Sequence, residues 1–102
     1  MSAQKPRVTK TDKETRAKMG LIVKSLREAA GLTQVELARL VNQNYFTFIS
    51  QVECGHVRIP PAETELWARI LGADTQAFAK ECVKAYEDQA YYRAIYGKRL
   101  ES

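Results

Sequence analysis

The chain has 102 residues, 45% of them hydrophobic and 27% charged, which is the composition of one ordinary globular domain. No apolar run approaches the ~20 residues of a membrane span, and the first residues lack the apolar stretch of a signal peptide, so we expect a cytoplasmic protein without a membrane partner. The net charge of +4 is uneven, because residues 1–27 hold eight of the sixteen Lys and Arg against two acidic residues and sum to +6.

The first predicted element is a flexible basic arm over residues 1–12, since this stretch has no apolar period and contains Pro6. Its basic side chains are Lys5, Arg7 and Lys10. Together with the basic residues of the helix that follows, they are suited to a polyanion such as nucleic acid. A solvated tail has the same composition, so charge alone leaves both interpretations open.

Two helices are predicted next, over about 13–30 and 34–41. The first ends at Gly31, which enters the left-handed conformation at low cost, and carries an apolar stripe at helical spacing, namely Met19, Ile22, Val23, Leu26 and Ala30. The second begins at "TQVE", a capping box in which the Thr33 hydroxyl and the Glu36 carboxylate each accept a backbone amide. Asn42 follows this helix and tolerates the left-handed conformation of a tight turn.

A third helix is predicted over about 45–54, with Asn44 as its N-cap and Gly55 as its stop. After the loop "HVRIPP", a fourth helix over about 61–71 buries four apolar residues, Leu66, Trp67, Ile70 and Leu71. A last, longer helix runs from a cap at Asp74 or Thr75 to about Tyr96, where Gly97 stops it. It carries an i+4 ridge of Phe78, Cys82, Tyr86 and Ala90, and more aromatic surface than one short helix exposes alone.

The order and spacing of these parts resemble the lambda repressor-like (Cro/C1, Xre) helix-turn-helix family, from Met19 to about Phe78. The matching stretches are "MGLIVKSLRE", "GLTQVELA", "FISQVECG", Pro60 and "LWARILGAD". The resemblance implies an all-α fold of five helices, in which residues 13–80 form a helix-turn-helix DNA-binding domain. The basic arm of residues 1–12 precedes it, and residues 81–102 form a C-terminal helical extension that we expect to dimerise.

The resemblance also implies local features of the helix pair. Ala38 stands where the family has a small residue at a close helix approach, and Asn42 stands at the glycine of its turn. Arg27 and Glu53 match positions that family members pair as structural charges. The buried aliphatic positions of the third helix fit Ile49 and Val52 only if one extra residue lies between Asn42 and Phe46.

With that register, the family's base-reading positions fall on the third helix, and we expect five residues to contact bases in the major groove: Tyr45, Phe46, Thr47, Ser50 and Gln51. Gln51 suits the adenine edge, Thr47 and Ser50 can donate or accept, and Tyr45 or Phe46 can pack on a thymine methyl. Core packing is the competing interpretation for Phe46 and for Phe48. The expected phosphate contacts are Lys18, Thr33, Gln34, Asn44 and Arg58, of which Gln34 matches the family's contact at a helix N-terminus.

The expected function is therefore that of a sequence-specific transcriptional regulator, a homodimeric repressor that reads an inverted repeat in double-stranded DNA. The expected dimer contacts are Tyr86, Ala90, Tyr92, Ile95 and Tyr96. An antitoxin or adaptor that uses the same fold to bind a protein is the alternative. No enzyme activity, metal, cofactor or small-molecule effector is expected, since Cys54, Cys82 and the single His56 lack metal-ligand spacing and no catalytic motif is present.

Overall fold

The computed structural model describes residues 10–43, 45–86 and 89–101, with side chains for 13–43, 45–86 and 91–97, and its regular structure is entirely helical. The elements in chain order are α1 (Lys10–Ala29), α2 (Gln34–Leu40), α3 (Phe46–Glu53), the 3-10 turn η1 (Pro61–Glu63), α4 (Thr64–Leu71), α5 (Thr75–Tyr86) and α6 (Gln89–Glu101). The all-α prediction is thus confirmed. No helix in the described ranges is long and apolar enough to cross a membrane.

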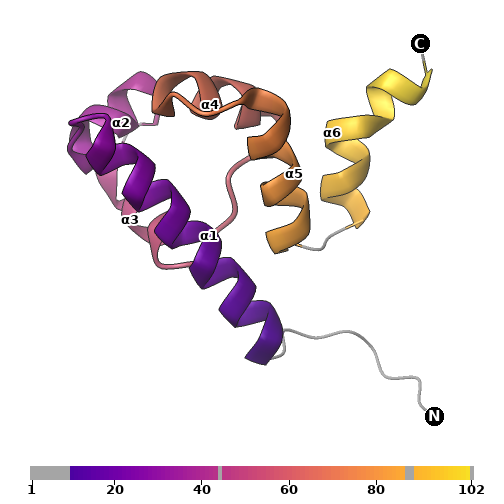
Figure 1. Cartoon of the computed structure of the whole chain (residues 1–102), viewed down its shortest axis with the longest axis horizontal. Coiled ribbons are helices and arrows are strands. Elements are labelled where there is room, and N and C mark those ends of the chain that lie inside the picture. The colour runs from indigo at the N-terminus through magenta and orange to yellow at the C-terminus, as the bar shows by residue number, and fades with distance from the viewer. Residues whose placement is uncertain (1–9, 44, 87–88, 102) are drawn as a thin grey trace.

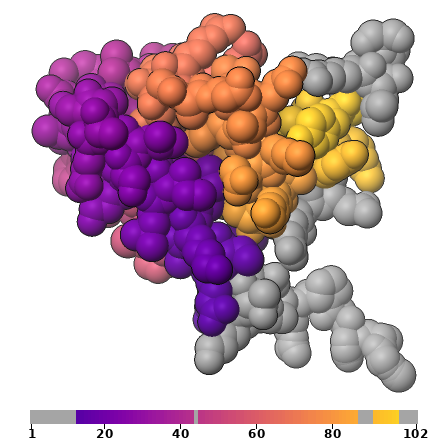
Figure 2. All heavy atoms as spheres, viewed as in Figure 1, coloured from indigo at the N-terminus to yellow at the C-terminus, as the bar shows by residue number. Residues whose placement is uncertain are grey.

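The long helix α1 organises the arrangement, because it packs against α3, α4 and α5 (Figure 1). The short helices α2 and α3 pack on each other at one end of the molecule, and α6 lies beside α5 at the other end. Figure 2 shows α1 and α5 side by side over one face. A hydrogen bond from the Thr15 hydroxyl to the Ala85 carbonyl, 3.1 Å long, links the first turns of α1 to the end of α5.

The core is continuous from α1 to α6. Its largest fully buried side chains are Trp67, Tyr91, Met19, Leu37, Ile49, Ile59, Val23, Val41, Val52 and Cys82. The indole of Trp67 remains satisfied, since Nε1 donates to the Glu63 carboxylate at 3.1 Å. Burial raises the pKa of the Cys82 thiol to about 12, which keeps this side chain neutral within the core.

The predicted helix ends are largely confirmed. The Glu36 amide donates to the Thr33 hydroxyl at 3.0 Å and the Thr33 amide donates to Glu36 Oε1 at 2.9 Å, so the capping box is complete. Asn42 has a φ of 63°, and Gly31 and Gly72 also have positive φ. These three residues follow the ends of α1, α2 and α4, as the local sequence predicted.

Two predicted boundaries need correction. Lys10, predicted in the arm, is the first residue of α1; its side chain lies outside the described part. The bond between Thr15 and Ala85 anchors these early turns to α5, which a purely local pattern does not reveal. The predicted helix over 61–71 is two elements, because Pro61 opens a 3-10 turn and α4 begins only at Thr64, whose hydroxyl donates to the Pro61 carbonyl at 3.3 Å.

The prediction of one long C-terminal helix is wrong. Asp74 does cap α5, accepting the Ala77 amide at 2.8 Å, but α5 ends at Tyr86 and α6 begins at Gln89. Helix α6 then continues through Gly97, the predicted stop, to Glu101. Helix α6 packs beside α5, where Tyr91 lies edge-on to Tyr86, with ring centroids 5.1 Å apart, and its side chain is buried. Burial of this large aromatic side chain favours the packing of α6 beside α5 over one straight helix that would leave Tyr91 more exposed.

A candidate nucleic-acid interface

Helix α3 has a buried face and an exposed face, and the predicted base-contacting residues lie on the exposed one. Ile49 and Val52 are 0% and 1% exposed, while Thr47 and Gln51 are exposed and Ser50 is partly exposed. Tyr45 and Phe46, at the start of the helix, are 71% and 50% exposed. The spacing of positions 46, 47, 50 and 51 places these side chains on one side of the helix.

The apolar spacing predicted for α3 is confirmed by its packing, since Ile49 and Val52 are buried. Phe48 is only partly exposed and lies edge-on to Trp67, with ring centroids 6.3 Å apart, so it belongs to the core. Gln51 is exposed, on the side of the helix away from the buried Ile49 and Val52. Phe46, for which core packing was the alternative, is half exposed and does not join the core.

The N-terminus of α3 differs from the prediction. Tyr45, in extended conformation, is the N-cap residue, and no side chain caps the helix there. Asn44, predicted as N-cap and phosphate contact, lies outside the described residues. The amides of the first turn of α3 therefore lack a side-chain capping bond in the part of the chain that is described.

A buried ionic network holds α3 against α1 and α2. Arg27 Nε donates to Glu53 Oε2 at 2.6 Å, and a second guanidinium nitrogen donates to Oε1 at 3.2 Å, which confirms the predicted pair. Arg27 also donates to the Leu32 carbonyl at 2.8 Å. The Glu53 carboxylate, acting chiefly through the hydrogen bond, raises the pKa of Arg27 against the opposing effect of desolvation. The network fixes the orientation of α3 relative to the rest of the core.

Gln34 belongs to the same network. Its Nε2 donates to Glu53 Oε1 at 3.0 Å, so this predicted phosphate contact is engaged within the protein and only partly exposed. The Thr33 hydroxyl, another predicted contact, accepts the Glu36 amide in the capping box. Both side chains thus have structural roles. The sequence predicted such a role for Thr33, in the capping box, but not for Gln34.

The basic residues expected to meet phosphates lie in different environments. Lys18 is exposed on α1. Arg58 lies in the loop after α3, where its guanidinium carbon is 5.5 Å from the ring centroid of Tyr91, and it is partly buried. Lys5 and Arg7 lie outside the described residues, as does the side chain of Lys10.

The expected dimer residues do not form one surface. Tyr86, predicted as a dimer contact, is 3% exposed and accepts the Ile59 amide through its hydroxyl oxygen at 3.3 Å, so it is a core side chain of its own chain. Tyr92 is 52% exposed and lies edge-on to Tyr96, with centroids 4.8 Å apart. Ile95 packs partly on the core, and the side chain of Ala90 lies outside the described part. The C-terminal segment therefore completes the core of its own chain and leaves Tyr92 outward.

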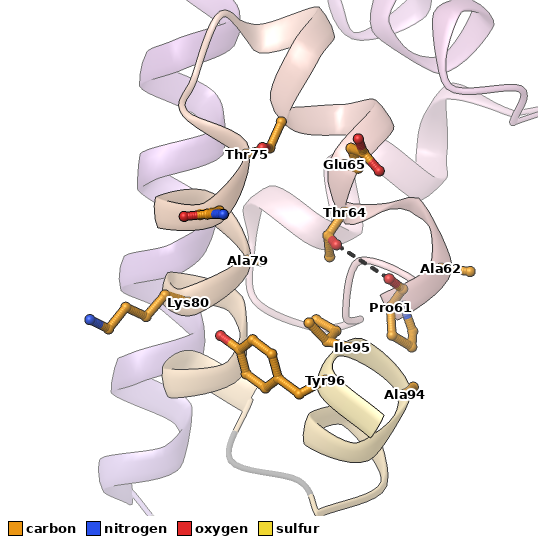
Figure 3. Close-up of a pocket in the computed structure, with 11 residues that line it drawn as sticks. Pro61, Ala62, Thr64, Glu65, Thr75, Ala79, Lys80, Ala94, Ile95 and Tyr96 are labelled. Carbon is orange, nitrogen blue, oxygen red and sulfur yellow. Dashed lines mark hydrogen bonds between the residues drawn. The ribbon is translucent and has the colours of Figure 1, made fainter. Parts of the chain in front are cut away.

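A groove of about 760 Å³ separates η1 and α4 from α5 and α6 (Figure 3). Ile95 and Tyr96 line it from α6, opposite Thr64 and Pro61, and Lys80 and Glu65 are its charged residues. Across the described ranges, no three His, Cys, Asp or Glu side chains are placed to hold a metal ion.

Two features of the site escaped the sequence-based reasoning. Gly20 lies where α1 crosses the end of α3, so closely that a Cβ there would be 2.1 Å from the Glu53 carbonyl oxygen. The signal was an isolated glycine inside a strong helical pattern, which often marks a close approach. The second feature is the burial of Tyr91, which is 1% exposed; its i, i+4 spacing with Ile95 is the signal that could have indicated a position facing the core.

Comparison with protein-family models finds no match, and comparison with curated proteins finds no similar sequence.

Proposed function

We propose that the chain is a lambda repressor-like helix-turn-helix protein that binds double-stranded DNA in a sequence-dependent manner and regulates transcription. In this proposal α2 and α3 are the helix pair, and α3 lies in the major groove. The observation that carries the proposal is the exposed face of α3, whose polar and aromatic side chains project from a helix held rigidly by Ile49, Val52 and the Arg27–Glu53 pair. A rigid helix with an uncommitted polar face suits base reading.

The exposed face of α3 is suited to recognition of bases by uncharged side chains. Gln51 can make two hydrogen bonds to adenine, and the exposed aromatic rings of Tyr45 and Phe46 can contact thymine methyl groups. No Arg or Lys lies on α3, so affinity for phosphate has to come from Lys18, from loop residues and from the basic N-terminal segment. Base specificity and charge-dependent affinity are thereby separated on different elements.

A Gln51→Ala variant tests the reading role. We expect it to lose about 1–3 kcal/mol of discrimination at one base pair, because a bidentate contact of this size specifies the base. Lys18→Ala is the matched control, which should weaken binding to all sequences about equally. Selection of preferred duplexes from a random pool, repeated for both variants, measures the difference. An unchanged preferred sequence and unchanged discrimination for Gln51→Ala would contradict a base-reading role for this face.

Dimerisation through α6 is the second part of the proposal, and Tyr92 supports it as a half-exposed aromatic side chain on the outer face of that helix. A two-fold dimer suits a palindromic site with half-sites one turn, ~34 Å, apart. We expect Tyr92→Arg to weaken dimerisation at least tenfold, ~1.4 kcal/mol, without lowering the melting temperature of the monomer. Leu40→Arg, at a 48% exposed position on α2, should leave the association constant unchanged. Sedimentation equilibrium measures the association constants of both variants. If the two substitutions changed the association constant equally, α6 would not be part of the dimer interface.

A protein-interaction role is the alternative that the surface also supports. Leu21, Val35 and Leu40 are 60%, 47% and 48% exposed, which is apolar surface that a protein partner could cover. Single exposed aliphatic residues are common, however, and carry less weight than the organised face of α3. A competition between selected and random duplexes at several salt concentrations separates the two functions, since an adaptor would show no preference.

A further inference from the structure

Two aromatic side chains at the start of α3 remain exposed in the folded chain. Tyr45 is 71% exposed and Phe46 is 50% exposed. Tyr45 occupies the N-cap position, where Ser, Thr, Asp or Asn is preferred because its side chain can accept an amide, and no side chain caps α3 there. Neither helix capping nor burial in the core accounts for the two rings. Adjacent exposed aromatic residues of this kind are typical of a surface that a binding partner covers.

Phe46 is suited to an apolar contact with a base. Half of its surface is covered by its own chain, so it loses less side-chain freedom on contact than a fully solvated side chain, and its exposed half carries no polar atom. In ordinary DNA the apolar group on the major-groove edge of a base pair is the C5-methyl group of thymine. The base 5-methylcytosine carries the same group on the same ring carbon. The ring is therefore matched to a methylated pyrimidine.

The polar side chains beside Phe46 do not distinguish thymine from cytosine. Ser50, four residues further along, is its neighbour on the helix surface, and Thr47 is exposed on the same side. A hydroxyl donates or accepts, so it can meet either the O4 acceptor of thymine or the N4 donor of cytosine. A carboxylate would select cytosine, but the one on α3, Glu53, is buried and paired with Arg27. Discrimination at this end of α3 is therefore left to the methyl group.

Phe46 and Gln51 lie at opposite ends of the exposed face of α3. Five positions of an α-helix correspond to about 7.5 Å along its axis, whereas successive bases of a DNA strand are ~3.4 Å apart. The two side chains are therefore suited to different base pairs. The preference of Gln51 for adenine consequently places no condition on the purine that is paired with the base beside Phe46.

We propose that the protein recognises the C5-methyl group of a pyrimidine through Phe46, and that it accepts thymine or 5-methylcytosine at this position and discriminates against unmethylated cytosine. This inference rests on the proposed function. It makes binding dependent on DNA methylation wherever a site has cytosine beside Phe46. Burial of one group of this size corresponds to about fourfold in affinity, ~0.8 kcal/mol.

The first test removes the methyl group and leaves the pairing edge of the base unchanged. Each thymine of the preferred duplex is replaced in turn by deoxyuridine, and the affinity of the full chain is measured by fluorescence anisotropy. We expect at least one replacement to weaken wild-type binding about fourfold. Phe46→Ala should bind the thymine duplex as weakly as the wild type binds the deoxyuridine duplex, with no further loss on the replacement. If no thymine is sensitive, or if the sensitivity persists in Phe46→Ala, the inference is overturned.

The second test changes the source of the methyl group. At the sensitive position the T·A pair is replaced by a C·G pair, with and without a methyl group on C5 of the cytosine. The methylated pair should bind about fourfold more tightly than the unmethylated pair, and about as tightly as the T·A pair. Equal binding of the methylated and unmethylated pairs would limit recognition to thymine and overturn the inference.

Leu40→Ala is the matched control, because it also shortens an exposed apolar side chain, 48% exposed, but on α2. It should retain the wild-type ratio of affinities for the thymine and deoxyuridine duplexes. Loss of this ratio in both variants would attribute the effect to the fold and count against Phe46. A wild-type chain that prefers no duplex sequence would contradict the proposed function itself, whereas a preferred sequence without methyl dependence would contradict only this inference.

Discussion

Replacing Gly20 by alanine should destabilise the protein by about 3 kcal/mol or more, at the upper end of what overpacking costs. A Cβ at this position would lie 2.1 Å from the Glu53 carbonyl oxygen and 2.8 Å from that of Val52. These atoms belong to the backbone of α3, which cannot move aside without disturbing Ile49 and Val52 beneath it. The helices would have to separate, and the buried Arg27–Glu53 pair would be strained. Chemical denaturation followed by circular dichroism measures the loss.

Gly97→Ala is the matched control, because Gly97 also lies within a helix but its nearest neighbour to a new Cβ is the Arg93 side chain at 3.4 Å. Alanine is the better helix former by about 1 kcal/mol, so this variant should be neutral or slightly more stable. The same difference in helix propensity would stabilise Gly20→Ala if α1 and α3 were far enough apart at Gly20 to accommodate a Cβ. If Gly20→Ala raised the free energy of unfolding by any amount, the close approach of α1 and α3 would therefore be contradicted.

Local chemistry was sufficient to predict the helix pair. The capping box at Thr33, the left-handed Asn42 and the apolar spacing of Ile49 and Val52 act within a few residues, so the sequence displays them directly. The same pattern placed Gln51 on the outer face. The partnership of Arg27 and Glu53 joins residues far apart in the chain, and it came from the family resemblance and not from spacing.

Tertiary contacts decided the rest. Both α5 and α6 have good local helix propensity, so local sequence does not reveal that α6 packs back beside α5, where the Tyr91 hydroxyl donates to the Ile59 carbonyl. Gln34 has the expected place at a helix N-terminus, yet its amide bonds to Glu53 because that carboxylate lies close by in the fold. Propensity sets which segments are helical, whereas burial and hydrogen bonding set how they end and what their side chains contact.

Replacing Arg27 by methionine should cost about 3–5 kcal/mol, the effect of removing one partner of a buried ion pair. Arg27 and Glu53 are 8% and 9% exposed, and the substitution leaves the Glu53 carboxylate with the Gln34 amide as its remaining side-chain donor in the described part of the chain. For a domain of this size, even the lower figure lowers the melting temperature by roughly 12 °C or more.

Arg69→Ala is the control for the loss of an arginine in an ion pair, since Arg69 pairs with Glu65 at 2.6 Å with both side chains about two-thirds exposed, 67% and 65%. Screening by solvent should keep its effect within about 0.5 kcal/mol. The double variant Arg27→Met with Glu53→Leu should recover much of the loss, because it removes the unpaired charge together with its partner. Thermal unfolding of the three variants distinguishes the possibilities. If Arg27→Met were as mild as Arg69→Ala, or if the double variant were no more stable than Arg27→Met, the cost would not come from an isolated buried carboxylate.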